Sequence, residues 1–322
     1  MLLTICICVV GLTVCAVIVL KRQKNTGARL QSEIEQQETL IADLEQKAAK
    51  KHNEISSIAQ EYEAAASDLR ASINYAERIQ RAIIPQDAEF KALFPDCFIF
   101  FEPRDIVSGD FYTCASSPEC KIAIVADCTG HGVPGGLLSM LGMSAIKDLF
   151  SKQKITKDFN PGDFLDALRK VILSSLAEAD ESDNTTVSDG MDISICAFNN
   201  EMTQMRYAAA NHTIYVARAG AIDKLKGSRM PIGRYPKQGE PFETFTYDLL
   251  PGDMVYMCSD GIQDQFGTPD NKKFTTKRLA AMLQENSPKD TLTQFADISK
   301  YVHDWEEGYN HYDDQTLVGI RI

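Results

Sequence analysis

The chain has 322 residues, 44% of them hydrophobic, and its 45 acidic against 33 basic side chains give a formal net charge of −12. The acidic balance excludes a generic nucleic-acid binder, because affinity for the phosphate backbone comes from clustered Lys and Arg. The hydrophobic fraction is ordinary for a globular core and excludes a wholly disordered chain. The nine cysteines show no C-x-x-C spacing, so we expect them to be reduced and mostly buried.

The first predicted element is an apolar segment at residues 2–20, which carries no charge and is long enough to cross a membrane as a helix. Lys21 and Arg22 follow it directly, so the positive-inside rule predicts that the rest of the chain is cytoplasmic. Two alternatives are weaker, since a cleaved signal peptide would need a basic start, and a lipoprotein signal a small residue beside Cys15. We therefore expect residues 1–21 to be a single-pass anchor in the inner (cytoplasmic) membrane.

A long helix is predicted next, because no Gly or Pro occurs from residue 28 to residue 84 and Pro85 then stops it. Apolar side chains along it alternate steps of four and three, which is the seam of a left-handed coiled coil. They include Leu30, Ile34, Ile41, Leu44, Ile55, Ile58, Tyr62 and Leu69. Such a stripe predicts a partner helix, most simply from a second copy of the chain, although the helix could also fold back on its own domain. Residues 22–85 are thus a predicted coiled-coil linker of a homodimer.

The remaining segment, residues 86–322, reads as strands with helices between them. The predicted strands are 97–101, 111–115, 121–127, 191–199, 205–210, 213–218, 242–247, 253–258 and 315–322, and the predicted helices are 134–150, 161–178, 276–285 and 291–307. Short turns join many of these strands, which implies antiparallel pairing. An α+β domain is therefore expected rather than a doubly wound one.

The segment KIAIVADCTGHGVPGGLLSMLGM, at residues 121–143, is a buried strand, a glycine-rich turn and a helix, with Asp127 at the end of the strand. A nucleotide phosphate cradle is the alternative, but the turn lacks both a Gly-Lys-Ser/Thr ending and G-x-G-x-x-G spacing. A nucleophilic Cys128 is disfavoured because no C-x₅-R loop follows it. Carboxylate oxygen is the ligand that Mg²⁺ and Mn²⁺ prefer, so the turn indicates a metal or phosphate site.

Four aspartates share this setting at strand ends or beside glycine turns. They are Asp110, Asp127, Asp260 and Asp313. One aspartate in a turn is usually structural. Four from strands distant in sequence can converge on two divalent cations and make a water between them a nucleophile toward phosphorus. The set therefore predicts a phosphate-hydrolysing metal centre.

Eight ordered motifs carry a resemblance to a known family. They are AERIQRAIIP (76–85), PRDIVSGDFY (103–112), VADCTGHGVPGGLLSM (125–140), SDGMDISICAF (188–198), YAAANHTIYVAR (207–218), PIG (231–233), YMCSDGIQDQ (256–265) and DDQTLVGIRI (313–322). Over residues 76–322 the chain resembles bacterial phosphatases of the stage II sporulation protein E type, a branch of the protein phosphatase 2C-like superfamily. The resemblance implies an antiparallel β-sandwich flanked by helices. It also implies metal-dependent hydrolysis of phosphoserine or phosphothreonine with two Mn²⁺ or Mg²⁺ ions.

The same resemblance implies a ligand set. The implied ligands are Asp110, Asp127, Cys128 through its backbone carbonyl, Asp260 and Asp313. Asp127 matches the carboxylate that bridges both metals and is the central catalytic residue. Ser108 departs from the family by replacing the first glycine of a G-G-D-F/Y motif, but it leaves the carboxylate of Asp110 in place.

Four further residues are candidates for the site. Spacing does not distinguish Asp313 from Asp314, and the resemblance gives Asp313 the direct role. His131 is a candidate general acid for the leaving serine oxygen, or alternatively a residue that stabilises the turn. Arg104 is a candidate phosphate clamp, because guanidinium binds phosphate oxygens bidentately. Asp192 matches a family motif that a strand-entry turn would also explain.

The resemblance also implies a substrate, a serine-phosphorylated regulatory protein of the anti-sigma antagonist type. The segment AERIQRAIIP resembles the element through which upstream helices control the catalytic domain. A different class of function is a catalytically silent, membrane-tethered adaptor that uses the same fold to bind a partner. The complete acidic set favours the enzyme.

Overall fold

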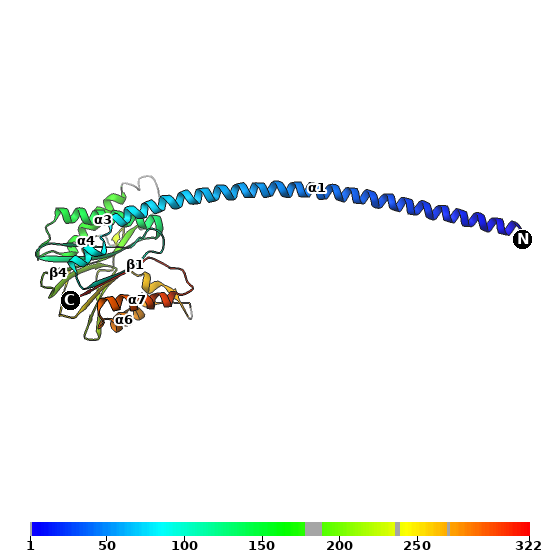
Figure 1. The fold of residues 1–322 in the computed structure, drawn as a ribbon. Coiled ribbons are helices and arrows are strands. Elements are labelled where there is room, and N and C mark those ends of the chain that lie inside the picture. The colour runs from blue at the N-terminus through cyan, green and yellow to red at the C-terminus, as the bar shows by residue number, and fades with distance from the viewer. Residues whose placement is uncertain (1, 178–188, 236–238, 269–270) are drawn as a thin grey trace. The chain divides into compact units, whose positions relative to one another are not determined.

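The computed structural model in Figure 1 describes residues 2–177, 189–235, 239–268 and 271–322, with side chains described from residue 11 onward. Within it, contacts divide the chain into two compact units, residues 1–70 and residues 71–322. The second unit contains all the described strands.

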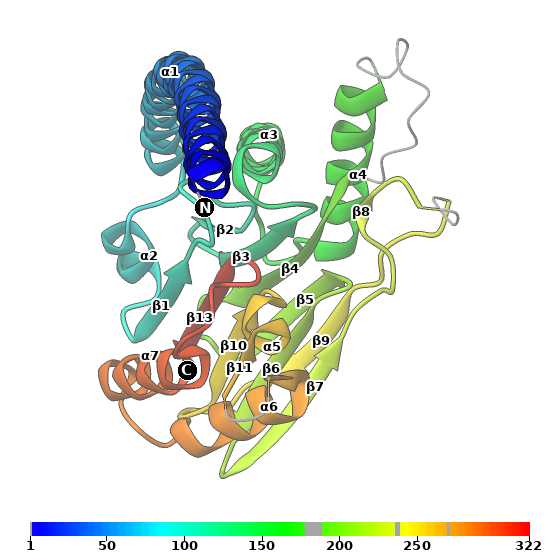
Figure 2. The ribbon, with the colours of Figure 1, turned by 90° about the vertical axis from the view of Figure 1, so that its right-hand side faces the viewer.

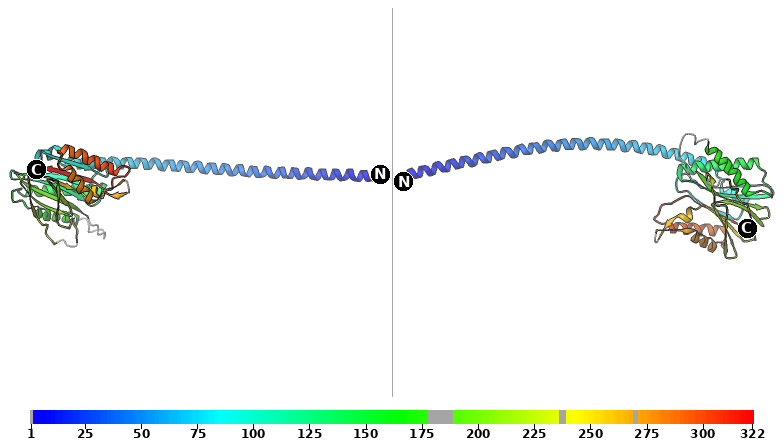
Figure 3. Two further views of the ribbon diagram at one scale, coloured as in Figure 1. Left: turned by 90° about the horizontal axis from the view of Figure 1, so that it is seen from below. Right: turned by 180° about the vertical axis from the view of Figure 1, so that it is seen from behind.

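The long N-terminal helix α1 spans Leu2–Ile83, and two further views show it as one continuous helix (Figure 3). It ends just before Pro85, as predicted, because proline cannot continue a helix and restricts the residue before it. The seam side chains are exposed on this single chain; for example, 54% of Leu30 and 62% of Leu69 are accessible. The predicted helical linker is therefore confirmed as a helix with an unpartnered apolar stripe.

The predicted transmembrane segment is not supported by the structure. No helix in the described residues combines the length and apolarity that a membrane crossing requires. Side chains of residues 1–10, half of the predicted segment, lie outside the described ones.

The second unit is built on two antiparallel sheets, and this confirms the predicted sandwich. The first sheet has the order β1 (Cys97–Glu102), β13 (Gln315–Arg321), β10 (Met254–Cys258), β6 (Thr213–Arg218), β7 (Ala221–Lys226). The second has the order β2 (Phe111–Ser116), β3 (Cys120–Cys128), β4 (Gly190–Asn199), β5 (Gln204–Ala210), β9 (Phe245–Asp248), with β8 (Ile232–Gly233) beside β4. Each of these strand pairs is antiparallel.

Helices cover both outer faces of the sandwich (Figure 2). Helices α3 (Gly132–Lys152) and α4 (Pro161–Ala177) pack on the second sheet, and α6 (Thr275–Asn286) and α7 (Thr291–Glu306) pack on the first. Short elements complete the unit: α2 (Asp87–Leu93), α5 (Gly261–Asp264), β11 (Phe266–Gly267) and β12 (Lys272–Lys273). The long helices match the predicted ranges to within two residues at each end.

Strand β3 shows how the sequence divides the core between layers. Its side chains alternate, so Ile122 and Ile124 pack under α3 and α4, while Ala123 and Val125 face the core between the sheets. All four are fully buried. A continuous apolar run, rather than an alternating one, is what a strand covered on both faces requires.

Several elements differ from the sequence prediction, among them the short α2, α5, β8, β11 and β12, which were not predicted. The strand expected at 242–247 begins only at Phe245, the first of these residues to pair with β5, and the Phe242 ring instead lies 4.7 Å from the guanidinium of Arg169. Strand β7 was not predicted at all. It is an edge strand whose residues are mostly exposed and charged, so it lacks the apolar alternation on which strand prediction depends.

Candidate metal centre and active site

The four predicted aspartates lie where strands of the two sheets begin or end. Asp110 directly precedes β2 and Asp127 is near the end of β3, strands that pair with Phe111 opposite Ala126. Asp260 follows β10 and Asp313 precedes β13, and these strands also pair antiparallel. In an antiparallel pair the end of one strand meets the beginning of the other. Each pair of aspartates is therefore brought to one edge of its sheet.

The electrostatics show that the four carboxylates are close enough to act on one another. Burial raises the pKa of Asp127 well above its ordinary value, and the charges of Asp110, Asp260 and Asp313 raise it further. Burial likewise raises the pKa of Asp110, with the nearby charges of Asp314 and Asp313 adding to the effect. Several carboxylates that share a buried site disfavour their own ionised forms unless a cation compensates them.

Asp110 has the surroundings of an incomplete ligand. It is 1% exposed, and its Oδ2 accepts a 2.6 Å hydrogen bond from Oγ1 of Thr316. Its Oδ1 has no hydrogen-bond partner among the described residues. Ser108, the departure from the family motif, accepts the backbone N–H of Asp110 on its Oγ at 3.1 Å and so supports the turn. The free oxygen is what a cation ligand would offer.

Glycines bring the backbone of Cys128 close to this turn. A Cβ atom on Gly109 would lie 2.7 Å from the carbonyl oxygen of Gly130 and 3.1 Å from that of Cys128. A Cβ on Gly135 would lie only 2.1 Å from the same Gly130 oxygen. Such close approaches require glycine. The Cys128 carbonyl, a predicted ligand, therefore lies beside the residue that precedes Asp110.

The Cys128 thiol has a different character from the carbonyl of the same residue. Only 2% of Cys128 is exposed, and burial raises the pKa of its thiol well above the ordinary value. The neighbouring carboxylates raise it further. A nucleophilic cysteine needs a lowered pKa and access, so this thiol has neither property.

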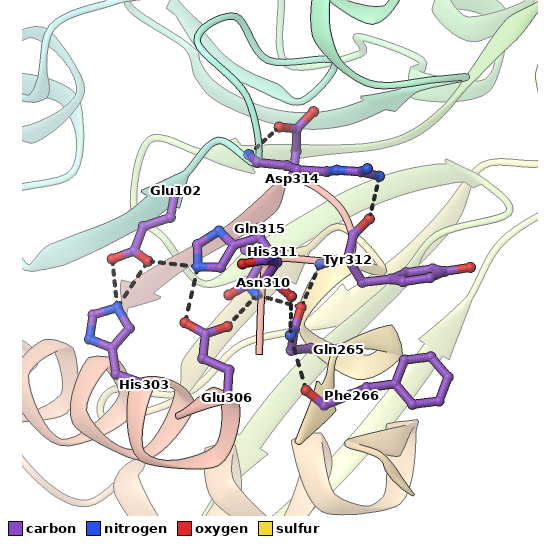
Figure 4. Close-up of polar contacts among 11 residues, drawn as sticks. Glu102, Gln265, Phe266, His303, Glu306, Asn310, His311, Tyr312, Asp314 and Gln315 are labelled. Carbon is purple, nitrogen blue, oxygen red and sulfur yellow. Dashed lines mark hydrogen bonds and ion pairs between the residues drawn. The ribbon is translucent and has the colours of Figure 1, made fainter. Parts of the chain in front are cut away.

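The paired aspartates of DDQT have unlike surroundings. Asp314 is 2% exposed, and its two carboxylate oxygens accept backbone N–H groups of Arg104 and Gly109, each at 2.7 Å. Figure 4 shows one of these two contacts, as a dashed line from the Asp314 carboxylate. Asp313 instead accepts the backbone N–H of Asp314 at 2.9 Å, and its charge raises the pKa of Asp110, Asp127 and Asp260. The Asp314 charge also raises the pKa of Asp110, more than the Asp313 charge does. Asp314 thus holds the loop before β2 while lying close to Asp110, and Asp313 acts on three members of the acidic cluster.

Arg104 and His131 make contacts that suit turns. Nη1 of the exposed Arg104 donates to the backbone oxygen of Tyr312 at 2.8 Å. Nδ1 of His131 lies 2.9 Å from Oδ2 of Asp105, and both side chains are more than two-fifths exposed. The His131 contact favours the turn-stabilising alternative over the predicted general acid.

Asp192 lies directly across the strand pair from Asp127. Its Oδ1 accepts a 3.0 Å hydrogen bond from Asn211, and burial raises its pKa to about 6. His212 is 7% exposed with no partner for Nε2 among the described residues, and burial lowers its pKa to about 4. All four residues, with Asp260, line one cavity of about 120 Å³. The structure therefore adds Asn211 and His212 to the surroundings of the acidic cluster.

Gln80, near the end of α1, is a site-supporting residue that the sequence did not single out. It is 3% exposed, and its Nε2 donates to the backbone oxygen of Ser108 at 2.6 Å and to Oγ of Ser139 at 2.8 Å. Its Oε1 accepts the backbone N–H of Ser108 at 3.1 Å. The sequence shows it only as a polar residue between Ile79 and Arg81 in the predicted helix, which does not indicate a role in the site. Gln80 links the helix directly to the turn that carries Asp110.

Two antiparallel sheets between helical layers, with aspartates gathered at strand ends, are the features of a protein phosphatase of the PP2C type, and the comparisons with known proteins show that class. The chain belongs to the stage II sporulation protein E (SpoIIE) family, whose model matches residues 117–322. PP2C-type serine/threonine phosphatases are a metal-dependent class of phosphoric monoester hydrolases, and this chain is one of that class.

Two solved structures and one curated relative are similar to the chain. The SiaA-PP2C domain of Pseudomonas aeruginosa superimposes with a TM-score of 0.70 at 28% identity, over 80% of this chain and 98% of that domain. The PP2C domain of SpoIIE from Bacillus subtilis, with a regulatory fragment, gives a TM-score of 0.55 at 17% identity, over 70% of this chain and 63% of that one. The phosphoserine phosphatase RsbU of Bacillus subtilis (strain 168) is 23% identical over 269 residues, 79% of this chain and 71% of RsbU.

Proposed function

We propose that the chain removes phosphate from phosphoserine or phosphothreonine of a regulatory protein, with two Mn²⁺ or Mg²⁺ ions. The observation that carries the proposal is the acidic cluster, in which neighbouring carboxylates raise one another's pKa and Asp110 Oδ1 has no partner among the described residues. The proposed ligands are Asp110, Asp127, Asp260, Asp313 and the backbone carbonyl of Cys128. This all-oxygen donor set suits hard divalent cations.

The chain's own residues give the site its preorganisation. Divalent ions, when bound, supply an activated water and neutralise charge on the phosphoryl group. Thr316 orients the Asp110 carboxylate through its hydroxyl, and Asp314 fixes the loop from Arg104 to Gly109 through two backbone N–H groups. Such supporting hydrogen bonds keep ligands in place and are a large part of what the protein contributes.

The protein substrate is proposed to be a serine-phosphorylated antagonist of an anti-sigma factor. RsbU, the curated relative, is itself a phosphoserine phosphatase. A structure from Mycobacterium tuberculosis with the same fold joins an RsbU domain and an RsbW domain in one chain, Rv1364c. These likenesses, together with the family, support a protein substrate in a partner-switching pathway.

The decisive experiment is phosphate release from a phosphoserine peptide by the full chain, with and without Mn²⁺. We expect release that depends on Mn²⁺ and is lost in Asp127→Asn. Asp158→Asn, an exposed aspartate outside the cluster, is the matched control and should retain the wild-type rate. Full turnover by Asp127→Asn would contradict the assignment. Absence of release from a folded chain with bound metal would favour the silent adaptor.

Dimerisation through α1 is proposed from its exposed seam. An apolar stripe of this length is stabilised when a second helix covers it, and a parallel dimer would let helix packing influence the catalytic unit. Analytical ultracentrifugation of the full chain should give a dimer. Leu44→Lys on the seam should weaken it, whereas Ala42→Lys off the seam should not. A wild-type monomer at high concentration would contradict the proposal.

Attachment to the inner membrane, with the catalytic unit in the cytoplasm, also stays a prediction from the apolar residues 2–20. The test is fractionation of cells that express either the full chain or residues 22–322. We expect only the full chain in the membrane fraction. The same distribution for both would remove the predicted anchor.

A further inference from the structure

A second group of metal-ligating side chains lies apart from the aspartate cluster (Figure 4). Glu102 is the last residue of β1, and His303 and Glu306 lie one turn apart on α7. His311 belongs to the segment that leads from α7 to β13. Three parts of the chain thus contribute two imidazoles and two carboxylates, distant in sequence, to one place.

The distances among three of these groups, Glu102, Glu306 and His311, suit the ligands of one small cation. Nε2 of His303 lies 2.9 Å from both carboxylate oxygens of Glu102. Nε2 of His311 lies 3.0 Å from Oε1 of Glu306 and 3.9 Å from Oε2 of Glu102. One ligand atom each of Glu102, Glu306 and His311 lies within 4.8 Å of the others. Ligands about 2.1 Å from a tetrahedral metal are about 3.4 Å apart, so only small shifts are needed.

One member of this group, Glu306, is buried. It is 7% exposed, and Nε2 of the fully buried Gln315 donates to its Oε2 at 3.1 Å. Oε1, the other end of the Gln315 amide, has no partner among the described residues. A buried carboxylate and an unpartnered amide oxygen are costly unless a cation or donor compensates them.

We propose that Glu102, Glu306 and His311 bind one Zn²⁺-like transition-metal ion, with a water as the fourth ligand, while His303 contacts Glu102 from outside. An imidazole with two carboxylates favours Zn²⁺ over Mg²⁺, whereas the all-oxygen aspartate cluster favours the harder ions. Gln315 would orient Glu306 in the manner of an outer hydrogen-bond partner.

The ion would have a structural consequence for the active site. His311 is two residues before Asp313, and the backbone N–H of Tyr312 between them already donates to Gln265 at 2.8 Å. A metal at His311 would join the start of this segment to β1 and α7. It would therefore fix the approach to Asp313 while remaining outside the reaction itself.

The test uses the metal-stripped full chain in excess Mg²⁺, which occupies the oxygen site, and follows added Co²⁺ and Zn²⁺. Four-coordinate Co²⁺ absorbs visible light much more strongly than six-coordinate Co²⁺, so the spectrum reports the coordination directly. We expect one equivalent of Co²⁺ with a four-coordinate spectrum that Zn²⁺ displaces. His311→Ala should weaken binding by 10- to 100-fold or more, roughly the range seen for perturbed metal sites.

Matched variants keep the result interpretable. Glu102→Gln changes a partly exposed side chain, so it tests the site if His311→Ala fails to fold. It should lose the four-coordinate spectrum, whereas His52→Ala, at an exposed histidine on α1, should keep it. A weak six-coordinate spectrum, or equal Zn²⁺ affinity in wild type and variants, would overturn the proposal. Neither result would bear on phosphate release by the aspartate cluster.

Discussion

Gln80→Ala should destabilise the catalytic unit and weaken its metal centre together. The substitution removes both hydrogen bonds that Gln80 makes with the backbone of Ser108 and the one with Ser139. The Ser108 oxygen keeps a bond from Oγ of Ser139, but its buried N–H is left without a partner. An unsatisfied buried group costs about 1–3 kcal/mol, and the truncated side chain leaves a void. We expect a total loss of about 2–4 kcal/mol in the free energy of unfolding.

Trp305 is the one tryptophan of the chain and lies on α7, so its fluorescence during urea unfolding reports on the catalytic unit. Arg81→Ala is the matched control, because this neighbouring side chain is 78% exposed and pairs only with Glu77 among the described ion pairs. It should change stability by no more than about 0.5 kcal/mol. Because Ser108 is two residues before Asp110, Gln80→Ala should also require more Mn²⁺ for phosphate release. An unchanged unfolding midpoint and Mn²⁺ dependence would refute the reasoning.

Three further predictions concern the charges of the site. Asp127→Asn should raise the unfolding midpoint of the metal-stripped protein, because it removes one of several neighbouring like charges. It should also abolish the stabilisation by Mn²⁺. Denaturation with and without Mn²⁺ measures both effects. Asp314→Asn should cost about 2–3 kcal/mol by disturbing two backbone hydrogen bonds, whereas Asp313→Asn should stay folded and bind Mn²⁺ weakly in calorimetry. Burial holds the pKa of His212 at about 4 against 6.5 when unfolded, so its contribution, about 3 kcal/mol, is present above pH 6.5 and is lost as pH falls toward 4. The free energy of unfolding should therefore depend less steeply on pH between 6.5 and 4 in His212→Gln than in the wild type. An identical pH dependence in both proteins would contradict the prediction.

The sequence predicted the antiparallel strands and the aspartates at their ends because both leave local marks, whereas the sandwich was implied by the family resemblance. Strand β3 is an uninterrupted apolar run that ends in an aspartate and a glycine turn, and antiparallel pairing then carries Asp127 toward Asp110. The long helix is marked by an absence of Gly and Pro over more than fifty residues, with Pro85 as its stop. Patterns of this kind depend only on neighbouring residues.

The features that sequence reasoning missed depend on contacts between distant residues. Asp314 is distinguished from Asp313 only by backbone groups about two hundred positions earlier in the chain. Gln80 is one polar residue in a helix until the Ser108 turn folds against it. The cluster of Glu102 with the histidines of the C-terminal region has no spacing that a linear pattern can detect.

The burial of Cys128 has a consequence under oxidative stress. Peroxide attacks thiolates that are accessible, and phosphatases that depend on a cysteine nucleophile are inactivated in this way. Here the thiol beside Asp127 is enclosed and its pKa is raised, and burial also raises the pKa of Cys196 and, to about 12, of Cys258. Dephosphorylation by this chain should therefore continue at peroxide concentrations that silence cysteine-dependent phosphatases in the same cell.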